Sequence, residues 1–185
     1  MTAVSLPCAF DKASLLLYHG CMRQVYRMFN EGDKISYPMH GAGFIEAIEE
    51  RDFLDEKKRF YVLRFSEGDI KVHVPIENAE RAGLRNIITT DECHHVMESF
   101  KTPDEAEESA NWNRRNRENL DKMKSGNVYE IASVIKSLLK RENQKNLSSS
   151  EKKMLGTSMQ ILVSELALAS NRNDEDVRKI ITQVL

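Results

Sequence analysis

The chain has 185 residues, of which 41% are hydrophobic and 30% are charged, and its formal net charge is −2. This composition excludes an intrinsically disordered protein, and the length allows one domain or two small ones. Apolar runs stay well short of the roughly 20 residues that a membrane-spanning helix needs. Three cysteines without regular spacing argue against a disulfide framework, so we expect a protein of the reducing cytoplasm.

The first 27 residues lack the alternation of a strand and contain one weak apolar stretch at residues 15–18. That stretch is too short for a convincing signal peptide. We expect residues 1–27 to be an extension of the folded protein, either a disordered tail or residues upstream of the true start. An added regulatory arm is the alternative.

Residues 28–86 carry strand signals. Short segments rich in β-branched and aromatic residues are separated by turns of Gly, Pro and Asp, which is typical of a small β-barrel. Residues 69–74 alternate most clearly, with Ile70, Val72 and Val74 on one face and His73 on the other. The expected strands are 33–37, 43–48, 59–65 and 69–74, with a polar loop at 52–57.

Residues 87–185 change to a helical period. A short helix is expected at 91–101, a helix start at Thr102-Pro103 with Glu105, and a charged helix from Trp112 to Lys124 that ends at Gly126. Further helices should open at Asn127 and at the capping box formed by Ser148 and Glu151, and a last one should carry Val177 and Ile181. The fold class is therefore α+β, a small barrel followed by a compact all-helical domain.

The segment from Trp112 to Lys153 holds eleven basic and five acidic residues. Trp112 is the only tryptophan, and Arg114, Arg115 and Arg117 follow it. A flat apolar ring beside cations can insert at a base step while the cations bind phosphates. The alternatives are a tryptophan packed between the barrel and the helices, and basic residues that form an ordinary solvated face.

Five segments together resemble the CarD/CdnL family of bacterial transcription regulators, from Met28 to the C-terminus. They are MFNEGDKISYPMHGAG at 28–43, Gly68-Asp69-x-x-Val72-x-Val74-Pro75, NWNRR at 111–115, LSSSEKKML at 147–155 and QILVSELALA at 160–169. The combination is specific, whereas a single Gly-Asp pair or a lone tryptophan would not be.

The resemblance implies a Tudor/SH3-like barrel that binds the β subunit of RNA polymerase, as the same barrel does in the transcription-repair coupling factor. Arg51 and His73 fall at polymerase-binding positions, although the family often has a longer or basic side chain at position 73. The helical domain is implied to lie on promoter DNA, where Trp112 wedges into the minor groove at the upstream bubble edge and stabilises the open complex.

The expected DNA-binding residues are Trp112, Arg114, Arg115, Arg117 and Lys152. The resemblance places Arg117 and Lys152 at basic DNA contacts. Among the three arginines we expect some to meet phosphates and one to pair with an acid such as Glu118, with little base-specific readout. The alternative function is a protein-interaction adaptor that does not bind DNA.

Other polar residues do not predict catalysis. We interpret His40 as part of a turn entering the barrel. Cys93, His94 and His95 have no second ligand pair at metal spacing, and common nucleotide-binding, hydrolase and zinc-protease motifs are absent from the sequence. We therefore expect no enzyme activity, no cofactor and no metal, and a protein that acts as a monomer.

Overall fold

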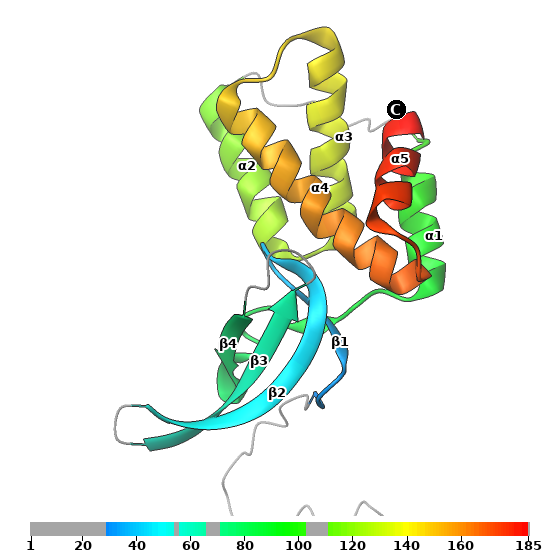
Figure 1. Ribbon diagram of the computed structural model, residues 1–185. Coiled ribbons are helices and arrows are strands. Elements are labelled where there is room, and N and C mark those ends of the chain that lie inside the picture. The colour runs from blue at the N-terminus through cyan, green and yellow to red at the C-terminus, as the bar shows by residue number, and fades with distance from the viewer. Residues whose placement is uncertain (1–28, 54–55, 66–70, 103–110, 185) are drawn as a thin grey trace, which may run out of the picture.

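The computed structural model describes residues 29–53, 56–65, 71–102 and 111–184 (Figure 1). The expected N-terminal extension, the first two residues of the strand expected at 69–74 and the helix start at Pro103 lie outside these residues.

The N-terminal part is a curved, five-stranded antiparallel sheet (Figure 1). Its strand order is β4-β3-β2-β1-β5, so the first four strands form a meander and β5 adds to the free edge of β1. This arrangement confirms the β domain expected ahead of the helices. The strands are β1 (Lys34–Tyr37), β2 (Gly41–Phe53), β3 (Glu56–Phe65), β4 (Lys71–Pro75) and β5 (Arg85–Asn86).

The polar loop expected at 52–57 was wrong in its bounds, because β2 reaches Phe53 and β3 begins at Glu56, with Asp52 opposite Lys57. Charged residues follow one another on both strands here and form ion pairs such as Lys57–Glu50, at 3.6 Å. Backbone pairing outweighs the low strand propensity of these residues where both faces of the ladder meet solvent. The short strand β5 was also not expected, because two residues give no periodic signal.

The helical part contains α1 (Thr90–Ser99), α2 (Trp112–Ser125), α3 (Val128–Gln144), α4 (Ser149–Ser170) and α5 (Asp174–Val184). Several expected boundaries are confirmed by their caps. Gly126 ends α2 in the left-handed conformation with φ of 70°, and Ser148 and Glu151 form the capping box of α4. Among these described helices, none combines the length and apolar character that crossing a membrane requires.

Two hydrophobic clusters divide the chain between Leu84 and Ile88. The first fills the curve of the sheet around Ile35, Tyr61 and Leu63, and the second lies among the helices, with α4 at its centre. Figure 1 shows that α2 and α3 pack along the N-terminal part of α4, whereas α1 and α5 pack near its C-terminal part. Helix α4 also contacts β2, so it belongs to the helical core and to the junction with the sheet.

Candidate nucleic-acid interface

Trp112 is the first residue of α2 and lies at the molecular surface, with 43% of its area exposed. The side-chain oxygen of Asn111 caps this helix by accepting hydrogen bonds from the N–H groups of Asn113, at 3.0 Å, and Arg114, at 3.4 Å. The tryptophan therefore sits on an ordered helix start. A large aromatic ring in this position is accessible to a partner rather than sealed in the core.

Arg114 and Arg117 are both exposed on α2 near Trp112. The expected pairing with Glu118 falls to Arg114, whose Nε donates to Oε1 of that carboxylate at 2.8 Å. This i,i+4 ion pair is solvent-exposed and therefore weak, so a phosphate can compete for the guanidinium.

Arg115 differs from its neighbours because only 5% of it is exposed. Its Nη2 lies 3.2 Å from Oε1 of Glu151, and Nε of Arg141 lies 3.2 Å from the same oxygen. We expected Arg115 among the DNA contacts, but in the structure its side chain points inward, because its guanidinium pairs with Glu151 of α4. Arg115 therefore links α2 to α4 beneath the exposed residues and is not accessible to a phosphate.

Glu151 links three helices at this end of the molecule. Its other oxygen, Oε2, accepts hydrogen bonds from the backbone N–H and the hydroxyl of Ser148, at 3.0 and 2.8 Å. Burial raises the pKa of the Glu151 carboxyl, but the Ser148 hydrogen bonds, the Arg115 hydrogen bond and the Arg141 charge together outweigh burial and lower the pKa. The carboxylate is therefore ionised at neutral pH and holds both arginines.

These contacts bring Lys152 and Trp112 to the same end of the helical domain, although 40 positions separate them in the sequence. Figure 1 shows the starts of α2 and α4 and the end of α3 together at the end farthest from the sheet. We call this end the helical tip. Its exposed cations are Arg114, Arg117, Lys140, Lys145, Lys152 and Lys153.

The helical tip contains residues that the sequence analysis missed. The contact of buried Arg115 and half-buried Arg141 with Glu151 could not be inferred, because the capping box at Ser148 explains Glu151 without any distant partner. Lys145, which ends α3, was counted within the basic segment but was not singled out. The one sequence signal for Lys145 was its position at the end of a predicted helix within the basic segment.

Arg51 and His73 meet on the outer face of the sheet. Arg51 lies within β2, not after it, and both its Nε and Nη2 donate to Oε2 of Glu49, at 2.9 and 2.7 Å. His73 on β4 approaches the same oxygen with Nε2, at 3.8 Å. One carboxylate therefore gathers the two residues that the resemblance assigned to a shared protein contact.

Across the described parts of the chain, no group of three or more His, Cys, Asp or Glu side chains could hold a metal ion. Cys93 is buried, and burial raises the pKa of its thiol, so it is a poor nucleophile. His94 and His95 beside it are exposed on α1.

Two family models match separate parts of the chain. A family model described as the CarD-like/TRCF RID domain matches residues 29–88, and one described as the CarD C-terminal domain matches residues 95–182. The chain is also 37% identical over 151 residues to YdeB of Bacillus subtilis (strain 168), which carries the name of a candidate transcription factor. That similarity covers 82% of this chain and 98% of YdeB.

Proposed function

Since the chain belongs to the CarD-like family of transcription factors, we propose that it binds RNA polymerase through the sheet and holds promoter DNA with the helical tip. The exposed indole of Trp112, flanked by Arg114 and Arg117 at the start of α2, carries this proposal. In the proposed arrangement the two domains are 28–86 and 87–185, and one copy of the chain acts on one polymerase in the cytoplasm.

The proposed polymerase contact is the outer face of the sheet around Arg51, Glu49 and His73, and its partner is the β subunit. The match to the RID domain supports an interaction with RNA polymerase. Glu49 holds the Arg51 guanidinium in place while leaving it exposed, so less side-chain entropy is lost when a partner carboxylate or carbonyl binds it. His73 offers a weaker donor than arginine would at the edge of the same contact.

The proposed DNA contact uses Trp112 as a wedge and Arg114, Arg117 and Lys152 as phosphate contacts, with Lys145 and Lys153 nearby. Arg115 is left out of this set because it is buried. Unstacking a base step costs a few kcal/mol, and least where the duplex is already distorted. A wedge therefore binds the edge of the bubble better than intact duplex and shifts the equilibrium toward the open complex. The proposal requires no catalysis.

Trp112→Ala tests the wedge in an assay of open-complex lifetime on one promoter with saturating protein. We expect the lifetime to shorten about tenfold, which corresponds to roughly 1.4 kcal/mol of lost preference. Binding to an isolated fragment of the polymerase β subunit should not change. Tyr129→Ala is the matched control, because Tyr129 is 45% exposed near the start of another helix, α3. A Trp112→Ala lifetime equal to that of the wild type would refute the wedge.

The dependence of DNA affinity on salt tests the phosphate contacts. Each phosphate bound contributes about 0.9 to the slope of log affinity against log salt concentration. Arg117→Ala should lower that slope by about 1. If the wild-type affinity for fork DNA does not respond to salt, the adaptor function is favoured instead.

A further inference from the structure

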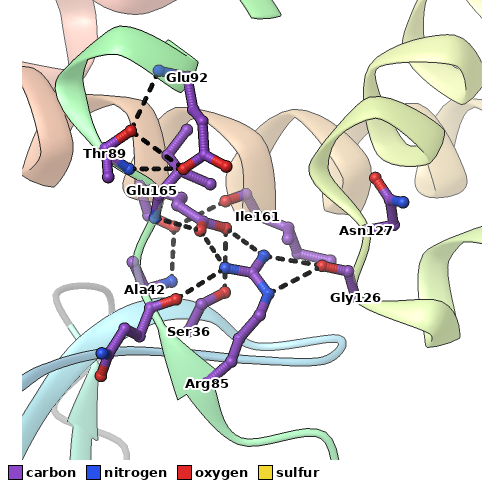
Figure 2. Close-up of polar contacts among 12 residues, drawn as sticks. Ser36, Ala42, Arg85, Thr89, Glu92, Gly126, Asn127, Ile161 and Glu165 are labelled. Carbon is purple, nitrogen blue, oxygen red and sulfur yellow. Dashed lines mark hydrogen bonds and ion pairs between the residues drawn. The ribbon is translucent and has the colours of Figure 1, made fainter.

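The junction between the sheet and the helices is built around a buried carboxylate, Glu165 of α4 (Figure 2). Only 1% of Glu165 is exposed, and Arg85 of β5 binds both its oxygens, at 2.5 and 2.9 Å. The Ser36 hydroxyl donates to Oε2 at 3.0 Å, and the Ile88 N–H donates to Oε1 at 3.2 Å. The carboxylate is thus bound by groups from β1, β5 and the segment that leads into the helices.

Arg85 has a second partner on α2. Its Nε and Nη2 donate to the carbonyl oxygen of Gly126, at 3.2 and 2.7 Å, and Gly126 is the residue that ends α2 (Figure 2). One guanidinium therefore joins an edge strand of the sheet, the buried carboxylate of α4 and the C-terminal end of the helix that begins with Trp112.

The backbones at this junction are in close contact. Gly41, with φ of 85°, leaves no room for a Cβ atom, which would collide with Oγ of Ser164 and lie 3.1 Å from Cα of Ile161. The Ala42 N–H donates to the same Ser164 hydroxyl at 3.0 Å, and Nζ of Lys34 donates to the carbonyl of Leu168 at 3.1 Å. Sheet and helices are therefore packed directly against each other, and the ion pair between half-buried Arg85 and buried Glu165 joins them.

We propose that Arg85 and Glu165 are positioning residues that fix the direction of α2, and so the place of Trp112, relative to the polymerase-binding sheet. This inference rests on the proposed function. Neither residue touches DNA or polymerase in it. They set where the wedge stands once the sheet is docked.

The length of α2 makes this control effective. Its 14 residues span about 21 Å, with Arg85 holding one end and Trp112 at the other. A tilt of about 10° at the held end would move the far end by about 4 Å, close to the rise of about 3.4 Å per base step along the duplex axis. A small change at the junction is thus enough to shift the indole by about one base step.

The effect of losing a rigid connection between the sheet and the helices follows from the physics of tethered binding groups. A rigid connection of the correct span presents the second binding group at a high effective concentration, and a loose one spreads it over a larger volume. Buried ion pairs are weak evidence for net stability, but they can specify a unique arrangement of the parts they join. Loosening the junction should therefore weaken joint action while leaving each separate affinity unchanged.

The test uses full-length Glu165→Gln and Arg85→Lys, with Glu175→Gln as the control for the same chemical change at an exposed site on α5. Glutamine keeps the shape of Glu165 without its charge. Lysine keeps the charge of Arg85 but cannot reach both Glu165 and Gly126 in the same geometry. We expect both variants to shorten the open-complex lifetime by about threefold to tenfold, and the control to match the wild type.

Three further measurements separate positioning from a general structural role. Affinities for fork DNA alone and for the β fragment alone should stay at wild-type values. Residual dipolar couplings should fit one common alignment for sheet and helices in the wild type, but two in the variants. In a Trp112→Ala background, Glu165→Gln should shorten the lifetime no further, because the residue acts through the indole.

The outcomes discriminate clearly. Wild-type lifetimes in both variants, with folding confirmed by thermal denaturation, would overturn the inference, as would a parallel loss of DNA or β-fragment affinity. If Trp112→Ala shortens the lifetime and the junction variants do not, only the positioning role fails. If Trp112→Ala itself has no effect, the proposed function fails first.

Discussion

Helix α4 carries two buried glutamates, Glu151 in its first turn and Glu165 in its last third, and each binds arginine. Glu151 holds Arg115 and Arg141, so its partners come from α2 and α3 within the helical domain. Glu165 holds Arg85, so its charged partner comes from the sheet. The first glutamate determines the shape of the helical tip, and the second determines where that tip stands.

The difference shows how α4 uses buried glutamates for two purposes, one within the helical domain and one at the junction with the sheet. At Glu151 the carboxylate also caps α4 through Ser148, and two cations compensate one buried anion. At Glu165 one cation is joined by two neutral donors, Ser36 and Ile88, which lie 129 and 77 positions away in the sequence. The contacts of Glu165 join distant segments and therefore depend on how the sheet and the helices are arranged. The contacts of Glu151 include a capping box and therefore depend mainly on local structure.

The largest expected effect is the loss of Glu151. Glu151→Ala removes the partner of a buried arginine and the capping box together, so we expect the free energy of unfolding to fall by about 3–5 kcal/mol in urea denaturation. Glu142→Ala, an exposed change on α3, should stay within about 0.5 kcal/mol of the wild type. A loss below about 1 kcal/mol for Glu151→Ala would mean that the tip does not depend on this carboxylate.

The junction should respond next, at Gly41. Gly41→Ala strains a positive φ and forces the new methyl group against Ser164, so we expect a loss of about 1–3 kcal/mol in the same assay. Gly32→Ala is the matched control, because Gly32 has φ of 87° with open space around it. Equal losses for the two variants would show that the sheet and helices are not tightly packed in solution.

A smaller effect is expected when acid protonates Glu151. The folded state lowers the pKa of Glu151, so its contribution to stability is present above the ordinary glutamate pKa of about 4.3 and is lost as the pH falls through the lowered value. Glu151→Gln should therefore reduce the loss of unfolding free energy between about pH 7 and pH 3. If that loss is as steep as in the wild type, other carboxylates dominate acid unfolding.

The smallest effect is expected at the surface of the tip. Arg114→Ala breaks only the exposed ion pair with Glu118, so the stability should change by no more than about 0.3–0.5 kcal/mol. The same variant should lower the affinity for fork DNA and flatten its dependence on salt. A large loss of stability with unchanged DNA affinity would reverse the roles assigned to Arg114 and Arg115.

The elements were largely predictable because their signals are local. Gly126 ends α2 since a left-handed residue is needed there, and Ser148 with Glu151 starts α4 since both satisfy free N–H groups within one turn. The two strands of the β2–β3 hairpin were expected at 43–48 and 59–65, but the charged extension of the hairpin beyond these bounds was missed for the complementary reason. Its charged residues carry no apolar alternation, and only pairing between the strands makes them extended.

The candidate interface was predictable in part. An exposed Trp112 followed by cations is visible in the sequence, and the expected pairing of one arginine with Glu118 was found. Which arginine turns inward was not predictable, because Arg114 and Arg115 have the same chemistry and differ by about 100° around the helix axis. The inward partner, Glu151, lies 36 positions away.

Local sequence patterns specify the two kinds of secondary structure, most of the helix ends and the basic segment around the only tryptophan. These properties depend on residues within one or two turns of each other. The tertiary structure alone decided that Arg115 is buried, that Arg51 and His73 share Glu49, and that Arg85 joins Glu165 to the end of α2. Each of these contacts joins segments whose approach depends on how the whole core packs, and neither propensity nor periodicity carries that information.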